Sequence, residues 1–282
     1  MGFVGGVFLL LTLPALARTK VVNDFKECAD SFLRVNNEIV YPTIFTEVDL
    51  QTHDRYQKIC QMRNSKTNNK HKYEFATLYD TSKKIPVYSA YKFDSTVSTT
   101  KTVRNENWYI EPQNPLKNSH TINIMGKYQA LLKDYETSGY DKGHLFPVSH
   151  AATQETVDAT FTLTNAVPQD RCLNEIWWRE MELKVRTYYT TKCIKNSVYV
   201  VTGASGSVIN GELTVPVYLW TAFCCSDITT RQWVSKAHFA KNDNSQIVKE
   251  YSVEDLEKKL TICFKTDFSI FQNKIIRCVW LS

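Results

Sequence analysis

Side chains that can hold a proton or a metal ion gather in one stretch of the chain, from Tyr140 to Glu182. His144 stands in the run DKGH, and imidazole is the side chain that accepts and releases protons near neutral pH. Asn165, Asn174 and Glu182 follow it, and their amide and carboxylate oxygens suit a hard divalent cation such as Mg²⁺. A base and a hydrated cation held close together could activate water for a hydrolytic reaction.

The residues around His144 predict two strands. Residues 140–146 are expected to end a strand, in which Gly143 permits a backbone conformation that places His144 at the edge of a cleft. Residues 159–165, with the sequence ATFTLTN, alternate as a second strand would, and Pro168 is expected to end that strand.

From Leu173 onward the chain has the pattern of an amphipathic helix. The apolar side chains that recur at three- and four-residue spacing form the stripe predicted to be buried: Leu173, Trp177, Met181, Val185 and Tyr188. The adjacent stripe contains Asn174, Trp178 and Glu182. A strand that carries His144 and a helix whose first turn carries Asn174 are rigid elements that would bring a base and a metal ligand together.

Three runs in this stretch resemble motifs of a known enzyme family. DKGH, NAVPQ and NEIWWREME are similar to the D-R-G-H, N-x-x-P-Q and N-x-x-x-W-x-x-x-E motifs of the DNA/RNA non-specific endonucleases. The resemblance implies a ββα-metal site in which His144 is the general base and Asn174 is the sole direct protein ligand of the metal. It further implies that Asn165 and Glu182 hold the base and the metal's waters.

The same resemblance extends to the substrate and the cofactor. Arg104, in R-N-x-x-W, resembles the upstream arginine that binds phosphate in the family. DNA and RNA are the substrates that the resemblance implies. Mg²⁺ is the expected cofactor, with Mn²⁺ as a substitute, because such a site is rich in oxygen and mostly hydrated.

One residue departs from the family motif. The runs KICQ, FATLYDTSKKIPVYSAY and VPVYLWTAFCC are similar to the secreted vertebrate endonuclease domain-containing 1 group, yet the family's arginine in D-R-G-H is Lys142 here. Lysine keeps the positive charge that binds substrate phosphate, but it lacks the planar guanidinium that holds phosphate bidentately. A secreted binding protein on the same fold, with weakened or lost catalysis, is therefore the alternative function.

Taken singly, these residues also have structural interpretations. Asn174 could be an ordinary residue of a helix N-terminus, and Glu182 could pair with Arg186 one turn later. The remaining histidines are interpreted as packed or surface residues: His53, His71, His120, His150 and His238. The order of the motifs favours the nuclease, and the sequence contains no H-E-x-x-H, G-x-S-x-G or Walker-type loop of another enzyme class.

Composition and the first residues predict a secreted globular protein. The chain has 282 residues, of which 43% are hydrophobic, and a net charge of +5 that is compatible with a polyanionic substrate and with an ordinary secreted protein. Residues 1–17 contain an apolar run followed by Ala15-Leu16-Ala17, which predicts a signal peptide, and the run is shorter than the roughly 20 residues of a membrane span. Residues 18–282 are expected to form a single endonuclease-like domain with its ββα core at about 138–190.

The eight cysteines all follow the predicted signal peptide, and their even number favours disulfides, with the pairing left open. No Cys-x-x-Cys pair or Cys/His cluster has the spacing of a zinc site. Cys224 and Cys225 lie in a predicted strand, so they are expected to point to opposite faces and to pair with different partners.

Residues 73–80 and 85–93 predict a hairpin. The fold class expected is α+β, with a mixed or antiparallel central sheet that is flanked by helices and stabilised by disulfides.

Overall fold

The computed structural model describes residues 20–45, 55–62, 72–95, 102–104, 107–111, 122–272 and 279–280. The predicted signal peptide at residues 1–17 lies outside these ranges, and so do His53, His71 and His120. Among the helices described, none has both the length and the apolar character that crossing a membrane requires.

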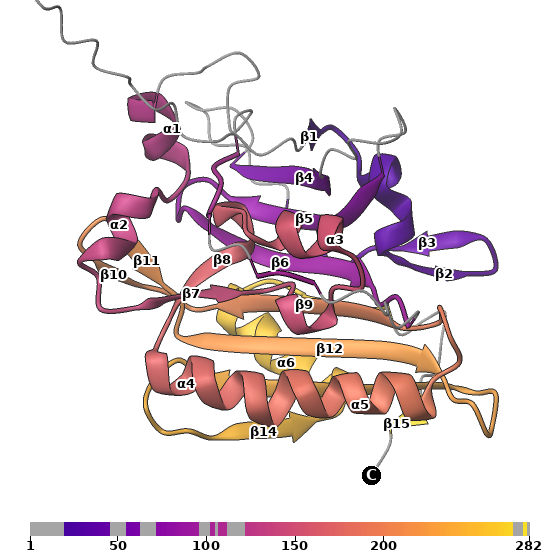
Figure 1. Ribbon diagram of the computed structural model, residues 1–282. Coiled ribbons are helices and arrows are strands. Elements are labelled where there is room, and N and C mark those ends of the chain that lie inside the picture. Colours follow the sequence, from indigo (N-terminus) through magenta and orange to yellow (C-terminus); the bar gives the residue numbers. More distant parts are fainter. Residues whose placement is uncertain are drawn as a thin grey trace, which may run out of the picture.

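Strands of these residues form one nine-stranded central sheet, seen in Figure 1. Its strands, in spatial order, are β1 (Lys20–Val22), β4 (Tyr56–Met62), β5 (Tyr73–Asp80), β6 (Ile85–Lys92), β9 (Tyr199–Ser205), β12 (Tyr218–Ser226), β13 (Trp233–Lys241) and β14 (Val248–Tyr251), with β15 (Val279–Trp280) beside β13. Every neighbouring pair is antiparallel except β13 and β15, which are parallel. The expected α+β class and the predicted hairpin, which is β5 and β6, are confirmed.

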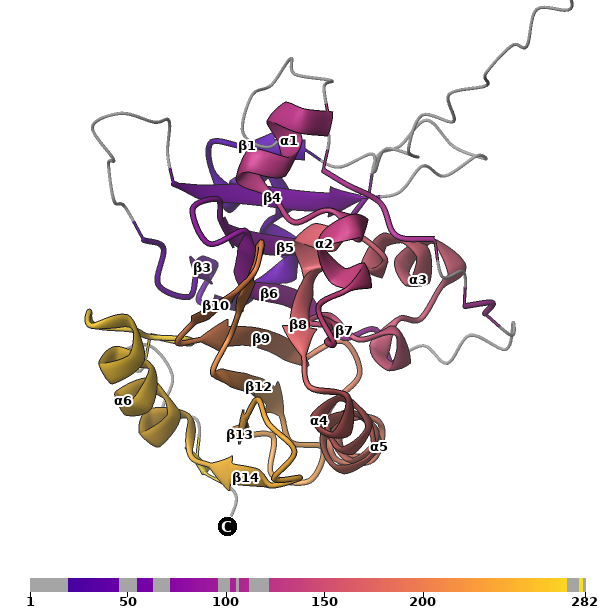
Figure 2. The same ribbon diagram turned by 90° about the vertical axis from the view of Figure 1, so that its left-hand side faces the viewer.

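Both faces of the sheet are covered, which explains why its central strands are apolar along almost their whole length. Figure 2 shows helix α6 (Val253–Phe264) on one side of the sheet and helices α4 (Arg171–Ile176) and α5 (Leu183–Lys192) on the other. The core on the α6 side also takes in η1 (Phe25–Ser31) and the hairpin of β2 (Leu33–Val35) and β3 (Glu38–Val40). Cys224 belongs to this core and Cys225 to the opposite one, so the expectation that they face apart is confirmed.

A small two-stranded sheet lies against the α5 side and carries the DKGH motif. Strand β7 (Asp141–His144) pairs antiparallel with β8 (Ala166–Gln169), and Lys142 lies opposite Pro168. The prediction of a second strand at residues 159–165 was wrong. Those residues end α3 (Gln154–Thr160) and form η3 (Leu163–Asn165), while Pro168 lies inside β8, a position that a two-stranded ribbon with a free edge tolerates.

The helix that follows contains a wide π turn. Between α4 and α5 lies a π segment, Trp177–Glu182, after which the amide of Leu183 donates to the carbonyl oxygen of Trp178. The buried side chains of the combined helix recur every four residues: Leu173, Trp177, Met181, Val185 and Tyr189. The prediction that Tyr188 ends this stripe was wrong, because Tyr188 is only half-buried and Tyr189 takes its place. An α-helix has 3.6 residues per turn, so such a stripe would drift around it, and the wider π turn compensates for that drift.

The remaining elements surround the ββα unit. They are α1 (Ile122–Tyr128), α2 (Leu132–Glu136), η2 (Val148–His150), β10 (Val208–Asn210) and β11 (Leu213–Val215). The hairpin of β10 and β11 lies beside α2, where the amide of Asn210 donates to the carbonyl oxygen of Ser138.

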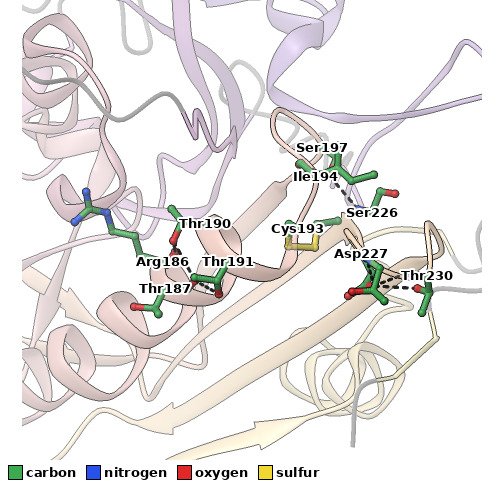
Figure 3. The surroundings of a disulfide bond; sticks show 12 residues. Arg186, Thr187, Thr190, Thr191, Cys193, Ile194, Ser197, Ser226, Asp227 and Thr230 are labelled. Carbon is green, nitrogen blue, oxygen red and sulfur yellow. Dashed lines mark hydrogen bonds between the residues drawn. A yellow bond between two sulfur atoms is a disulfide. The ribbon is translucent and has the colours of Figure 1, made fainter.

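Among the residues that the structure describes, two disulfides join elements that are distant in the sequence: Cys28 to Cys60, and Cys193 to Cys225. Figure 3 shows the second one at the end of α5, where Cys193 is tied to strand β12. Beside it the amide of Ser226 donates to Oγ of Ser197 at 3.1 Å, and Asp227 Oδ1 accepts from Thr230, so hydrogen bonds also hold this corner. The disulfide therefore fixes one end of the helix that carries Asn174 and Glu182.

Removing this disulfide should destabilise the protein strongly. Each bridge closes a loop with a sequence separation of 32, and the double variant Cys193→Ser/Cys225→Ser is expected to lose about 2–4 kcal/mol of unfolding free energy. Urea unfolding without reductant measures the loss. The control is Cys172→Ser, which alters an exposed free thiol and should shift stability by no more than about 0.5 kcal/mol.

Candidate active site

One cavity of about 530 Å³ brings together most of the residues that the motifs single out. Its lining contains five of them: Arg104, Lys142, His144, Asn174 and Glu182. Asn165, the sixth, is not among the lining residues. Strand β7, the turn η2 and the helix from α4 through the π segment form the walls, as the predicted strand and helix required.

His144 is held between aromatic rings at the cavity edge. Its ring centroid lies 4.6 Å from that of Trp108 and 4.8 Å from that of Phe161, and its Nε2 atom is buried without a hydrogen-bond partner among the described residues. Burial, with a smaller contribution from the Arg104 guanidinium, lowers the pKa of His144 to about 3. The imidazole is therefore neutral at physiological pH, which is the protonation state that a base needs.

The side-chain amide of Asn174 has a defined orientation. Its Nδ2 donates to Oδ2 of Asp141 at 3.1 Å, and because a carboxylate only accepts, the amide oxygen must be the other atom. Asp141 is in turn 3.6 Å from the guanidinium of Arg171. The arrangement leaves Oδ1 of Asn174 as an oxygen that could bind a cation. The Asp141 carboxylate orients this amide, as hydrogen-bond partners orient the ligands in known metal sites.

Glu182 is almost completely buried at the inner wall of the cavity. The hydroxyl of Ser149 donates to its Oε2 at 2.8 Å, and its backbone carbonyl oxygen lies 2.9 Å from Nε2 of His150. Burial raises the pKa of Glu182 to about 7, although the Ser149 hydrogen bond and Arg104 act in the opposite direction. A buried carboxylate of this kind favours a nearby positive charge, which would restore its ionised form.

Asn165 uses its side chain to hold the loop after His144. Its Oδ1 accepts from the Phe146 amide and the Ser89 hydroxyl, and its Nδ2 donates to the carbonyl oxygens of Phe146 and Thr160. Its backbone carbonyl accepts from Leu145. All of these partners belong to the loop and its surroundings, so any support that Asn165 gives to His144 acts through the backbone beside the ring.

Two cations lie at the cavity over aromatic rings. The Nζ atom of Lys142 is 5.9 Å from the Trp108 ring centroid and 5.7 Å from that of Tyr135, while the Arg104 guanidinium is 5.7 Å from that of Phe161. Aromatic faces attract cations at such distances. Both positive charges are thus kept near His144, where a phosphate could meet them.

Gly143 serves a purpose that the sequence did not indicate. It lies in strand β7 without a positive φ, so the expectation of a special backbone conformation was wrong. A Cβ at this position would lie 2.0 Å from Oε1 of Gln169, whose side chain packs directly over the glycine. The glycine is required for space, so that β8 can approach β7 beside His144.

Two residues near the motifs contact Glu182, and no pattern in the sequence predicted this. Ser149 and His150, in the turn after DKGHLF, both bond to Glu182, and the sequence assigned His150 only to the packed or surface class. His150 is indeed buried.

Burial lowers the pKa of His150 to about 4, which predicts a specific pH dependence of stability. In the unfolded chain this histidine takes up a proton near pH 6.5, whereas the native ring stays neutral until about pH 4. The stability that it contributes is therefore present above pH 6.5 and lost as the pH falls toward 4. Between pH 7 and pH 5, urea unfolding should show a loss about 2 kcal/mol larger for the wild type than for His150→Gln. Equal losses of unfolding free energy in both proteins would mean that the native His150 ring takes up its proton at the same pH as the unfolded one.

The polar groups of the cavity fit a hydrated divalent cation. No cluster of three or more His, Cys, Asp or Glu side chains suited to a metal occurs in the ranges that the structure describes, which is unlike a zinc or calcium cage. One oriented amide oxygen and one buried carboxylate suit instead an ion that keeps most of its water, as Mg²⁺ does.

Comparison with known proteins places the chain in a family. Residues 53–273 match the sequence model of the DNA/RNA non-specific endonucleases. The chain belongs to this family. The family resemblance and the ββα-metal endonuclease fold expected from the motifs are both confirmed.

The relatives of this chain include two that are named for the endonuclease domain. It is 31% identical to the Endonuclease domain-containing 1 protein of Homo sapiens over 236 residues, which cover 78% of this chain and 44% of that protein. For the Mus musculus protein the identity is 28% over 201 residues, covering 66% and 39%. The chain thus spans less than half the length of these curated relatives.

More distant members share the fold. Mitochondrial Endonuclease G of Homo sapiens is 39% identical over 77 residues, covering 27% of this chain and 25% of that protein. The solved structure of a complex of EndoG with EndoGI superposes with a TM-score of 0.53 at 19% identity, covering 70% of this chain and 82% of that one. At this identity the likeness concerns the fold.

Proposed function

We propose that this chain is a secreted, Mg²⁺-dependent endonuclease that hydrolyses phosphodiester bonds of DNA and RNA without strong sequence preference. The observation that carries the proposal is the pairing of a neutral, half-buried His144 with the oriented amide oxygen of Asn174 across one cavity. Membership of the nuclease family supports the reaction class. The signal peptide at residues 1–17 and the single domain at residues 18–282 remain predictions that are part of this proposal.

His144 acts as the general base in this proposal. The neutral imidazole, which lines the cavity, accepts a proton from the attacking water, and the rings of Trp108 and Phe161 pack against it and hold it in place. Asn165 braces the backbone that follows the histidine. A general base of this type contributes typically about 10²–10⁴-fold to a rate.

Asn174 and Glu182 would hold the cation, directly and through its waters respectively. A bound Mg²⁺ supplies positive charge to the phosphate and the leaving oxygen. Lys142 and Arg104 bind the substrate phosphate from the cavity rim. Because phosphate and sugar contacts carry no base information directly, a site of this composition accepts many sequences and both kinds of nucleic acid.

The proposal is tested by incubating the purified full chain with plasmid DNA and with RNA, in Mg²⁺ or in EDTA. Cleavage of both substrates in Mg²⁺ and none in EDTA is the expected result. If neither Mg²⁺ nor Mn²⁺ supports cleavage while salt-sensitive binding to nucleic acid persists, the protein is the binding protein that Lys142 suggests.

Lys142→Arg should retain nuclease activity or raise it. A guanidinium can stack on the rings of Trp108 and Tyr135 as the ammonium does, and it adds a planar pair of donors for a phosphate. One charge-assisted hydrogen bond is worth about 1.5–3 kcal/mol, so a gain of about tenfold to a hundredfold in kcat/KM is the upper limit. Lys142→Met, which removes the charge and keeps much of the length, is the matched control and should lower kcat/KM. A loss of activity in Lys142→Arg would show that the position does not bind phosphate.

A further inference from the structure

One short turn holds Glu182 at two points. In η2, Ser149 donates from its hydroxyl to the Glu182 carboxylate at 2.8 Å, and His150 donates from Nε2 to the Glu182 carbonyl oxygen at 2.9 Å. Adjacent residues therefore fix the side chain and the main chain of the same glutamate. The turn also follows His144 closely in the sequence, so it connects both parts of the candidate site.

The tautomer of His150 follows from its partners. A carbonyl oxygen only accepts, so Nε2 carries the proton and Nδ1 of the neutral ring must accept. The hydroxyl of Tyr91 lies 2.7 Å from Nδ1 and supplies that donor. Tyr91 belongs to β6 in the central sheet, and its ring stacks on Phe146 with centroids 3.9 Å apart. A continuous series of contacts thus joins the sheet to Glu182 through His150.

The segment that receives these contacts is an unusual one. Glu182 is the last residue of the π segment, which replaces ordinary α-helical bonding by the bond from Leu183 to Trp178. Single π turns are rare and are frequently found at functional sites. Here two hydrogen bonds from η2 hold the last residue of the segment, and η2 stands between two cavities. Ser149 lines the cavity that contains His144, and His150 lines another of about 330 Å³. The His150 ring also packs against Phe93 and Tyr189, with ring centroids 5.7 Å and 5.5 Å away, so hydrogen bonds and aromatic packing together fix this turn.

We propose that His150 and Tyr91 are positioning residues, which hold the π segment in register and thereby keep the Glu182 carboxylate in the cavity with His144. This inference rests on the role proposed for Glu182. His150 itself acts through the Glu182 main chain, and the substrate would not touch it. Loss of the Nε2 donor would release the π turn, since an α-helical register would rotate the Glu182 side chain relative to Asn174.

Variants of the full chain separate the hydrogen bond from mere filling of space. His150→Gln retains an N–H near the position of Nε2, whereas His150→Leu has a similar size and no donor. The first measurement is hydrogen exchange of the peptide covering residues 177–186, which needs no enzyme activity. We expect faster exchange there in His150→Leu and near wild-type exchange in His150→Gln. Leu256→Ala, which truncates a buried side chain of α6 on the opposite face of the sheet, is the control that should lower overall stability without a local effect on this peptide.

The second measurement is the Mg²⁺ affinity by calorimetry. His150→Leu is expected to weaken it by about tenfold to a hundredfold, as the loss of outer-shell support does at other metal sites, and His150→Gln to preserve it. Equal exchange and equal affinity in the Leu and Gln variants would overturn the proposal.

Two further outcomes separate this inference from the proposed function. Where His150→Leu does not fold, Tyr91→Phe decides the matter, because it removes only the hydroxyl and keeps the ring on Phe146. Faster exchange in residues 177–186 supports the proposal, and unchanged exchange refutes it. A wild-type protein that cleaves nothing refutes the proposed function, while the exchange comparison still decides whether His150 holds the π segment.

Discussion

His144→Ala is expected to abolish phosphodiester hydrolysis and to leave the fold intact. The imidazole is the neutral base in the cavity, and its loss should lower the rate by about 10²–10⁴-fold, which a plasmid-nicking assay with purified protein measures. Because strand β7 is held by its pairing with β8 rather than by the ring, circular dichroism should match the wild type. The control is His238→Ala, which removes a buried histidine from β13 and should keep its activity. Cleavage at the wild-type rate by His144→Ala would exclude this residue as the base.

The pH profile gives this assignment a second test. An unperturbed histidine would lose its base function near pH 6.5, but burial lowers the pKa of His144 to about 3, so the neutral form persists in mildly acidic solution. A fall in activity near pH 7 would report Glu182 instead, whose pKa burial raises to about 7. In that case Glu182→Gln, which cannot titrate, should remove the inflection.

The motifs predicted which side chains share the cavity. Helical spacing places Asn174, Trp178 and Glu182 along one side, and the family motifs that these residues resemble imply that the strand with His144 faces that side. The hairpin of β5 and β6 follows for the same reason, since its two aromatic and β-branched runs are separated by a short polar turn.

What the sequence could not predict depends on contacts between distant residues. The alternation in residues 159–165 is too short to distinguish a strand from the end of a helix followed by a 3₁₀ turn. The four-residue spacing of the buried stripe did hold a signal for the π turn, because an α-helix would not keep that stripe on one face. The bond between His150 and Tyr91 spans 59 residues and leaves no local pattern.

Asn174→Ala should raise the Mg²⁺ requirement of the enzyme more than any other single change in the cavity. The variant removes the one amide oxygen that Asp141 orients toward a cation, so calorimetry should detect little or no Mg²⁺ binding at concentrations that saturate the wild type. Glu182→Ala, which acts through waters in this proposal, should weaken binding less completely.

Asn174→Asp distinguishes the contribution of the oxygen ligand from that of the amide donor, which orients this side chain toward Asp141. Aspartate supplies an oxygen and a negative charge, but it cannot donate to Oδ2 of Asp141, and the two carboxylates would repel each other across the distance that the hydrogen bond now spans, 3.1 Å. If the amide donor matters, Asn174→Asp should bind Mg²⁺ more weakly than the wild type despite its added charge. The double variant Asp141→Asn/Asn174→Asp should recover part of the lost Mg²⁺ affinity, because it restores one donor and one acceptor. Unchanged Mg²⁺ binding in Asn174→Ala would place the metal elsewhere in the protein, and the geometry at Asp141 would then have only a structural meaning.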